Sequence, residues 1–354
     1  MNLSVFGDLG LTVPILGLIG VSLAVIGSTA PALFSQQLIF FVIGFALYLI
    51  FSSLDYRLWK RFNWVFYIFS LLFLISAFFG VKVRGASRWI DIAGINLQPS
   101  ELIKPLFILV IVSFLVKEAR QGRLKSLLMF LPILILIFRQ PDLGNVLVYL
   151  FTYLAIMVAD GLPLLYLAIS SLVFGILLPL FWFILKDYQK IRLLSFINPY
   201  ADPLSAGYNS IQAMIALGSG QLMGLGLGRG TQSHLRFLPE FHTDFVFASL
   251  GEELGFIGAS MVIIFYLILL GRILKAGSST GDDFGKLLTL GIFAQLFIQV
   301  FINIGMNLGL LPITGITLPL LSYGGSSIIS TFIELGLIAS VLRISRARDT
   351  IVIR

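Results

Sequence analysis

The sequence predicts an all-α integral membrane protein of about ten transmembrane helices, with a large extracellular loop between helices seven and eight. Of its 354 residues, 58% are hydrophobic and 12% are charged, whereas soluble domains are roughly 45–50% apolar and about 25% charged. The apolar residues gather in runs that approach the ~20 residues a helix needs to cross a bilayer. These runs show no period-2 alternation, which favours helices over a β-barrel.

The predicted helices follow one another along a single polytopic membrane domain, residues 1–354. They cover 9–29, 33–53, 64–80, 101–116, 126–138, 145–159, 163–185, 246–270, 287–308 and 326–342. The runs at 126–138 and 145–159 are shorter than a bilayer requires, so they are expected to be tilted, broken or extended into their polar flanks. No basic segment precedes the first run, so that run is predicted to be retained as a helix.

The distribution of Lys and Arg predicts the orientation, because cytoplasmic loops of membrane proteins are enriched in these residues. With both termini in the cytoplasm, the cytoplasmic segments 54–63, 117–125, 271–286 and 343–354 carry 14 basic residues, against four in the short outside segments. This asymmetry explains the net charge of +7 without a nucleic-acid partner. The chain has no cysteine and two histidines, which excludes disulfides, thiolate metal sites and multi-histidine metal centres.

The connection 186–245 is the long extracellular loop, and loops of this length are usually functional or disordered. It contains apolar and aromatic residues throughout, among them Phe196, Tyr200 and Phe237. Such a composition argues against disorder. We therefore expect an ordered segment that partly re-enters the membrane interface.

Two polar clusters lie in the first half of the chain. Arg84 and Arg88 are expected at the outer membrane surface, and Glu101 and Lys104 lie three residues apart on one helical face. They are interpreted either as an anion-binding pocket for a phosphate group, or as arginines at lipid headgroups beside a structural ion pair. Asp142 lies in the turn sequence PDLG, where a capping role for the following helix competes with a functional one.

The third cluster gives the strongest candidate, Asp244, which follows His242 and Thr243 at the outer mouth of the eighth predicted helix. Thr243 and Asp244 are placed either to cap that helix or to let the carboxylate act as a general base on a substrate hydroxyl. Glu252 lies eight residues on and is expected to share the cavity wall with Asp244, whereas Glu253 is expected to face other helices.

A fourth stretch, residues 303–327, is interrupted by prolines and glycines where two helices should meet. Irregular backbone at membrane depth is tolerated where protein or a watery cavity satisfies its polar groups. The stretch is therefore expected to line the same cavity as Asp244. A plain hairpin between the ninth and tenth helices is the alternative.

Five motifs in consistent order carry a family resemblance. They are HTDF with the following GEELG, QPSELIK, QPDLG, NPYADP with the following GYN, and LPLLSYGGSS. Together they resemble the shape, elongation, division and sporulation family of bacterial membrane proteins, whose members include RodA and FtsW. The stretch TQSHLRFLPE is more similar to RodA than to FtsW. Asn145 departs from the pattern, since relatives usually carry threonine there.

The resemblance implies a peptidoglycan glycosyltransferase that polymerises lipid II at the outer face of the bacterial cytoplasmic membrane, for cell elongation and shape. It also implies a class B penicillin-binding protein as the partner that supplies transpeptidation. The family's essential aspartate falls on Asp244. Cationic stabilisation of the leaving diphosphate would come from Arg84, Arg88, Lys104 or a divalent cation, Mg²⁺ or Mn²⁺. The full set of residues expected to bind substrate is Arg84, Arg88, Gln98, Glu101, Lys104, Asp142, Gln212, His242, Thr243, Glu252, Ser322, Tyr323, Gly324 and Ser326.

Two other functions fit the same residues. A flippase for the lipid-linked precursor would also use intramembrane charges and broken helices. A non-catalytic scaffold for the penicillin-binding protein would need neither a base nor a substrate path. Polymerisation from purified lipid II, compared with lipid translocation across sealed vesicles, separates these functions.

Overall fold

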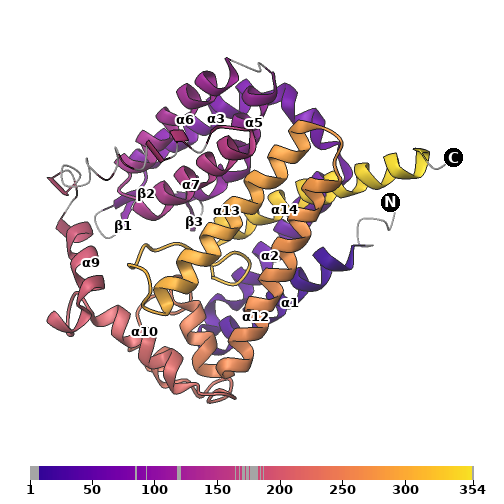
Figure 1. The fold of residues 1–354 in the computed structure, drawn as a ribbon. Helices are drawn as coiled ribbons and strands as arrows, with labels where there is room; N and C mark the ends of the chain where they lie inside the picture. Colours follow the sequence, from indigo (N-terminus) through magenta and orange to yellow (C-terminus); the bar gives the residue numbers. More distant parts are fainter. Residues whose placement is uncertain are drawn as a thin grey trace.

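The computed structural model describes residues 8–83, 86–92, 94–117, 121–163, 165–166, 168–169, 172, 175, 182–183, 185 and 187–352. Long helices dominate the fold and run past one another in a bundle, as Figure 1 shows. The helices are α1 (Leu9–Thr29), α2 (Pro31–Ser53), α3 (Asn63–Ser76), α4 (Pro99–Leu102), α5 (Lys104–Lys117), α6 (Gly122–Arg139), α7 (Leu143–Ala159), α9 (Asp187–Ile197), α10 (Tyr208–Ser219), α11 (Thr231–His234), α12 (Val246–Ser279), α13 (Asp283–Asn307) and α14 (Gly325–Val352). Short 3₁₀ helices cover Tyr56–Phe62, Ala77–Phe79 and Pro199–Ala201.

The predicted transmembrane helices are found with changes in their lengths. In the described part of the chain, six helices are long and apolar enough to cross a membrane: Leu9–Thr29, Pro31–Ser53, Tyr56–Phe79, Val246–Ser279, Asp283–Asn307 and Gly325–Ala347. The prediction at 126–138 becomes α6, which extends into its polar flanks, and the prediction at 145–159 becomes α7, of 17 residues. The prediction at 101–116 is divided between α4 and α5. The seventh predicted helix, 163–185, lies largely outside the described residues.

Helices α13 and α14 form the centre of the bundle, and α2 and α3 lie at its edge. The apolar windows of α13 and α14 are 67% and 78% buried within the protein, whereas those of α2 and of Tyr56–Phe79 are 28% buried. Helix α2 packs directly on α14, and Gly336 makes this close approach possible, because a Cβ there would lie 2.9 Å from the Tyr48 carbonyl oxygen. Helix α2 therefore presents its remaining apolar surface to lipid.

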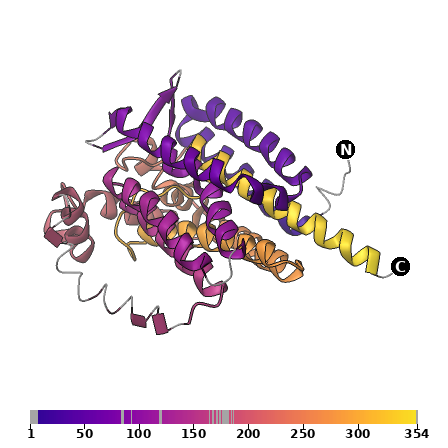
Figure 2. The same ribbon diagram turned by 90° about the horizontal axis from the view of Figure 1, so that it is seen from above.

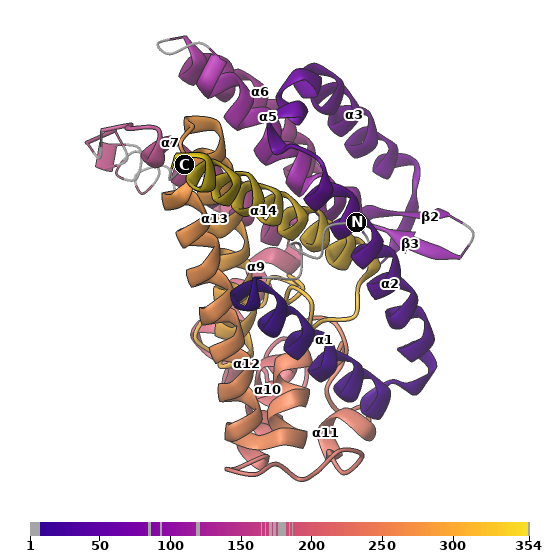
Figure 3. The same cartoon turned by 90° about the vertical axis from the view of Figure 1, so that its right-hand side faces the viewer.

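A small antiparallel sheet lies between α3 and α4 and was not predicted. Strand β2 (Ala86–Ile92) pairs with β1 (Val81–Val83) and β3 (Ile95–Leu97). The hairpin projects from the helical body, as Figure 3 shows. In β2 apolar and polar residues alternate only over Ile90, Asp91 and Ile92, and this pattern is too short to separate a strand from a polar loop. The sheet places Arg88 beside the start of α4.

The long connection 186–245 is ordered over its described length, as its composition predicted. It contains α9, α10 and α11. Helix α10 packs against α12 and α13, and Ala213 and Ala216 are buried in that contact. Figure 2 shows this segment at one end of the helical body. The segment therefore covers the start of α12, where Asp244 lies.

The beginning of α1 and the later part of α14 lie at the same end of the bundle. Asp8, at the start of α1, accepts hydrogen bonds from Arg272 Nε at 2.8 Å and from Arg346 Nη2 at 2.6 Å. Arg343 donates at 2.9 Å to the carbonyl oxygen of Ser53, at the end of α2. This basic end is opposite the end at which α12 begins, because Arg272 lies roughly 40 Å along α12 from Val246 at 1.5 Å per residue.

Candidate active site

Asp244 is partly exposed and lies just before α12 in a loop held by two asparagines of α13. Asn303 Nδ2 and Asn307 Nδ2 donate to the backbone carbonyl oxygen of Asp244 at 3.1 and 3.0 Å. These bonds fix the main chain at Asp244. The N-cap of α12 is Phe245, whose own side chain makes no capping hydrogen bond, and the first-turn amide of Ala248 donates to Asn307 Oδ1 at 3.0 Å. The capping interpretation of Thr243 and Asp244 is therefore wrong, because the helix begins one residue too late for it.

The stretch 317–327 wraps around the Asp244 loop, as its broken sequence predicted. Ser322 Oγ donates to the carbonyl oxygen of Thr243 at 2.6 Å, and the amide of Tyr323 donates to the carbonyl oxygen of His242 at 2.8 Å. Ser322 Oγ also accepts from the amide of Leu318 at 2.8 Å. The carboxylate-bearing loop and the SYGG segment thus form one unit, and the plain-hairpin interpretation does not describe it.

Aromatic rings stand at the edge of this unit. The rings of His242 and Tyr323 are 5.7 Å apart, and Tyr323 Oη donates to Gln36 Oε1 at 2.6 Å. Burial lowers the pKa of His242 although the charge of Glu240 opposes the shift. Burial therefore favours the neutral form of this imidazole, which lies two residues before Asp244. His242, Thr243, Tyr323 and Gly324 are all partly exposed, as a substrate contact requires.

A second polar group joins the SYGGSS segment to the first half of the chain. The amide of Gln98 donates to Ser326 Oγ at 2.9 Å, and Gln98 Nε2 donates to Asp142 Oδ2 at 2.8 Å. Asp142 caps α7 through the amide of Asn145, as the PDLG turn predicted. Asn145, the residue that departs from the family pattern, also donates from Nδ2 to Asp142 at 3.0 Å and to Ser100 at 3.3 Å. Gln98, Asp142 and Ser326 are buried, so this group sets the wall of the site and does not line its opening.

Glu101 and Lys104 form the predicted ion pair, and they form it in the interior. Lys104 Nζ lies 2.6 Å from Glu101 Oε1, and the two side chains are 1% and 4% exposed. Glu334 of α14 is also fully buried, and it lies within electrostatic range of both. Neither side chain of the pair is placed to touch a substrate in this conformation. The expectation that Lys104 stabilises a leaving diphosphate therefore does not fit its burial, while the structural ion-pair interpretation does.

Glu252 and Glu253 hold the loop that precedes α12. Glu252 is fully buried and accepts hydrogen bonds from the amides of Gln232 and Ser233 at 2.7 and 3.1 Å and from Ser233 Oγ at 2.8 Å. It caps α11 and does not share an open wall with Asp244. Glu253 accepts from Ser28 Oγ at 2.5 Å and contacts His234 Nε2 at 2.9 Å, so it faces other elements as expected.

The backbone of α12 is broken just after Glu252 and Glu253. Gly255 has φ 67° and ψ −165°, a conformation that favours glycine, and α12 is kinked at this residue. The kink frees the carbonyl oxygens of Glu252 and Glu253. They accept from the amides of Leu225 and Gly226 at 2.9 and 3.0 Å.

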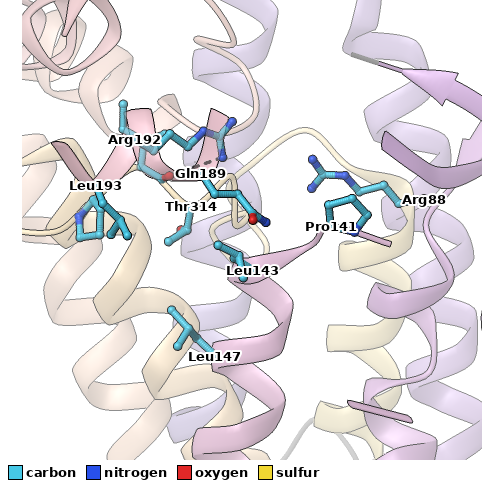
Figure 4. A pocket seen from close by; sticks show the side chains of 10 residues that line it. Arg88, Pro141, Leu143, Leu147, Gln189, Arg192, Leu193 and Thr314 are labelled. Atoms are coloured by element: carbon cyan, nitrogen blue, oxygen red, sulfur yellow. Dashed lines mark hydrogen bonds between the residues drawn. The ribbon is translucent and has the colours of Figure 1, made fainter. Parts of the chain in front are cut away.

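A pocket of about 80 Å³ lies between α7, α9 and the 312–314 loop. It is lined by Arg88, Pro141, Leu143, Leu147, Gln189, Arg192, Leu193, Pro312, Ile313 and Thr314. Figure 4 shows the guanidinium groups of Arg88 and Arg192 pointing toward each other from opposite sides, with Gln189 between them. Among the predicted substrate-binding residues, Arg88 is the member that this pocket contains.

Sequence reasoning missed Arg192, Asn303 and Asn307. Arg192 is one basic residue in a long loop, and no periodicity distinguishes it. Asn303 and Asn307 lie four residues apart on α13, so their shared face was a signal for a polar contact inside the bundle. Gln212 is partly exposed on α10, which packs against α12 and α13. Arg84 lies outside the described residues.

Among the described residues, no three His, Asp or Glu side chains gather to hold a metal ion. The divalent cation expected from the family resemblance stays a prediction. If a cation takes part, the donor set described here gives it Asp244 but no closed protein cage, so further ligands would have to come from a substrate phosphate or water.

Comparison with known proteins decides the family. The chain matches the family model named FtsW/RodA/SpoVE, described as cell cycle protein, over residues 3–347. The chain belongs to this family. It is 34% identical over 305 residues to the peptidoglycan glycosyltransferase MrdB of Escherichia coli K12, covering 84% of this chain and 82% of that protein. It is 35% identical over 316 residues to the probable peptidoglycan glycosyltransferase FtsW of Trichlorobacter lovleyi, covering 86% and 82%.

Solved structures share the fold of this chain. A chain from a peptidoglycan synthase complex that coordinates polymerization and crosslinking is similar with a TM-score of 0.82 and 30% identity, covering 96% of this chain and 98% of that one. The rod shape determining protein RodA of Thermus thermophilus is similar with a TM-score of 0.71 and 28% identity, covering 95% and 96%. The all-α multi-pass fold is thereby confirmed. The nearly equal identities to MrdB and FtsW do not separate the two branches of the family.

Proposed function

We propose that Asp244 is the general base of the peptidoglycan glycosyltransferase that this chain forms, and that the substrate is lipid II. Of the three functions that fit the sequence, the enzyme is the one that the names of its relatives support. The observation that carries the residue assignment is the Asp244 loop itself. Asn303 and Asn307 fix its main chain, and Asp244 is partly exposed one position before the N-cap of α12.

The chemistry requires a base at this position. The 4-hydroxyl of the acceptor sugar attacks the anomeric carbon of the donor glycan, and its proton passes to the Asp244 carboxylate. The new bond joins the acceptor oxygen to the donor carbon, while the bond from that carbon to the lipid diphosphate breaks and the diphosphate leaves with the electron pair. An alcohol is a weak nucleophile until a base accepts its proton, and a positioned base contributes typically 10²–10⁴-fold in rate.

The proposed orientation places this reaction at the outer leaflet. Asp244 and the basic end of the bundle lie at opposite ends of α12, and Lys and Arg favour the cytoplasmic side. Both chain ends would then be cytoplasmic. A lipid-linked substrate can keep its prenyl tail in the bilayer while its sugars reach the site. The relative in the synthase complex supports a partner of the crosslinking kind, and we propose a class B penicillin-binding protein.

The base assignment is tested by replacing Asp244 with asparagine, which keeps the size of the side chain and removes the basic oxygen. The purified variant, combined with its partner and lipid II, should polymerise at least about 100-fold more slowly than the native chain. Asp187→Asn is the matched control, because the Asp187 side chain is 97% exposed and should leave the rate unchanged. Long glycan strands formed by the Asp244→Asn variant at the native rate would refute the assignment.

The orientation is tested by single cysteines, since the native chain has none. Leu204→Cys lies in the 186–245 segment and Lys275→Cys at the basic end, and both positions are exposed. A membrane-impermeant maleimide should label the first in intact spheroplasts and the second only after permeabilisation. The reverse pattern would place Asp244 in the cytoplasm and overturn the proposed function.

A further inference from the structure

The assignment of Asp244 as the base gives no role to the pocket between α7, α9 and the 312–314 loop. We propose that it binds the diphosphate and first prenyl units of the donor lipid, with Arg88 and Arg192 on the phosphates. This inference rests on the proposed function and assigns one substrate, the donor, to a place in the site. It also gives a role to Arg192, which no sequence pattern singled out.

The cationic part of the pocket is built from two distant segments. Arg88 comes from β2, and its side chain is 20% exposed. Arg192 comes from α9, more than a hundred residues later. Their guanidinium groups face one another across the pocket (Figure 4). Two planar forks on opposite sides match the two phosphates of a diphosphate, because guanidinium groups bind phosphate oxygens in bidentate fashion.

Two of the contacts that hold these arginines are long. Arg88 Nη1 lies 3.4 Å from Asp142 Oδ1, and Arg192 Nη1 donates to the carbonyl oxygen of Ile313 at 3.5 Å. Charge-assisted bonds to phosphate have lengths of about 2.7–2.9 Å. A diphosphate would therefore offer Arg88 and Arg192 shorter bonds than these two contacts.

The rest of the pocket is apolar and open toward the lipid. Leu143 and Leu147 of α7 line one side and Leu193 of α9 another. Leu147 and Leu193 are 46% and 36% exposed, so this wall continues to the outer surface of the bundle. A free sugar phosphate would gain nothing from such a wall. A prenyl diphosphate has a charged head for the arginines and a hydrocarbon chain for the leucines.

One loop separates the pocket from Asp244, and this closeness favours the donor. Ile313 and Thr314 line the pocket, and a Cβ at the next residue, Gly315, would lie 3.4 Å from Asp244 Oδ2. In the donor, the diphosphate is bonded directly to the carbon under attack. In the acceptor, a disaccharide separates the attacking 4-hydroxyl from the diphosphate. A diphosphate so close to the base is therefore the leaving group.

Binding is tested with undecaprenyl diphosphate, the product that leaves, on the full-length chain in detergent. Arg192→Leu should weaken binding about 10- to 100-fold, the loss expected for a charge-assisted contact, and Arg192→Lys should restore part of it. Arg229→Leu is the control, because Arg229 is exposed and lies outside the pocket. Equal binding by the native chain and Arg192→Leu would overturn the proposal. Inorganic diphosphate should bind far more weakly than undecaprenyl diphosphate. Equal binding of the two would show that the leucines of the pocket do not contact the prenyl chain.

Kinetics separate the donor from the acceptor. A leaving diphosphate gains charge in the transition state, so Arg192→Leu should lower kcat of polymerisation as well as raise KM. A higher KM with unchanged kcat would move the pocket to the acceptor. The Asp244→Asn variant should still bind undecaprenyl diphosphate at least as tightly as the native chain, because the pocket is unchanged and a nearby negative charge is removed. If Asp244→Asn stays active, the base assignment is wrong and the pocket assignment is unaffected. If Arg192→Leu binds undecaprenyl diphosphate normally, the pocket assignment is wrong and the base assignment is unaffected.

Discussion

The buried ion pair at the start of α5 gives a prediction whose size follows from its geometry. Lys104 Nζ is 2.6 Å from Glu101 Oε1 in a site closed to water. With an effective dielectric constant of 20, the attraction at this distance is about 6 kcal/mol. Part of it is offset because removing the lysine also removes its desolvation penalty. Measured losses on breaking buried pairs are about 3–5 kcal/mol, and we expect Lys104→Met to fall in that range.

Because Glu334 lies near the pair, removing Lys104 and removing the Glu101 charge should lower the free energy of unfolding by different amounts. Removal of Lys104 leaves the carboxyl groups of Glu101 and Glu334 in the interior without that cation, whereas removal of the Glu101 charge leaves Lys104 near Glu334, which can ionise to balance it. Glu101→Gln should therefore cost only about 1–2 kcal/mol, the scale of one lost hydrogen bond. Lys104→Met combined with Glu334→Gln should recover part of the loss caused by Lys104→Met alone.

The assay is unfolding of the purified chain in mixed micelles by increasing mole fraction of dodecyl sulfate, followed by tryptophan fluorescence. Lys117→Met is the control, because Lys117 is exposed at the other end of the same helix. A Lys104→Met midpoint equal to that of the native chain and of Lys117→Met would refute the reasoning. Equal losses for Lys104→Met and Glu101→Gln would show that Glu334 does not share the charge.

Three further predictions concern other polar contacts. Asp142→Ala removes the cap of α7 and the acceptor for Gln98. It should lower the free energy of unfolding in the same assay by about 1–3 kcal/mol. A change below about 0.5 kcal/mol would contradict this prediction. In Glu252→Gln, the side-chain NH₂ group would face the hydrogen-bond donors of α11, so proteolysis of the 220–235 loop should be faster. The Glu252→Asp variant keeps a carboxylate and should be cleaved at a rate closer to that of the native chain. Burial alone would raise the pKa of Asp8, but hydrogen bonds and charge from Arg272 and Arg346 lower it. The stability lost in the Asp8→Asn variant should therefore be constant above about pH 5 and should shrink as the pH falls below about 4. A stability difference that grew with acidity in pH-dependent thermal melts would reverse that sign.

Much of the fold was predictable because membrane helices carry their own signal. In α1, α2, α12, α13 and α14 the apolar runs are long enough to satisfy every backbone group internally, so length and hydropathy suffice. The hairpin at 81–97 was not predictable, since its strands are short and depend on pairing with one another. The 3₁₀ segments beside α3 and the break at Ile103 depend likewise on packing.

The candidate site also contains some contacts that the local sequence predicts and others that it does not. The PDLG turn predicted that Asp142 caps a helix, because capping is a local interaction. The role of Glu252 was not predictable, since the amides it binds come from α11, about twenty residues earlier, and the kink at Gly255 turns it toward them. Lys104 likewise belonged with the phosphate-binding candidates until its burial was known.

The sequence by itself determined that the chain spans a membrane, which end is basic, and that Asp244 stands where a helix leaves an irregular polar segment. These properties depend on composition and local spacing along one chain. The tertiary structure decided which polar groups meet. Only packing brings Asn303 to the Asp244 main chain, buries Lys104 against Glu101, and places Arg192 opposite Arg88. Contacts between residues so far apart depend on how the helices cross, and no local pattern encodes that crossing.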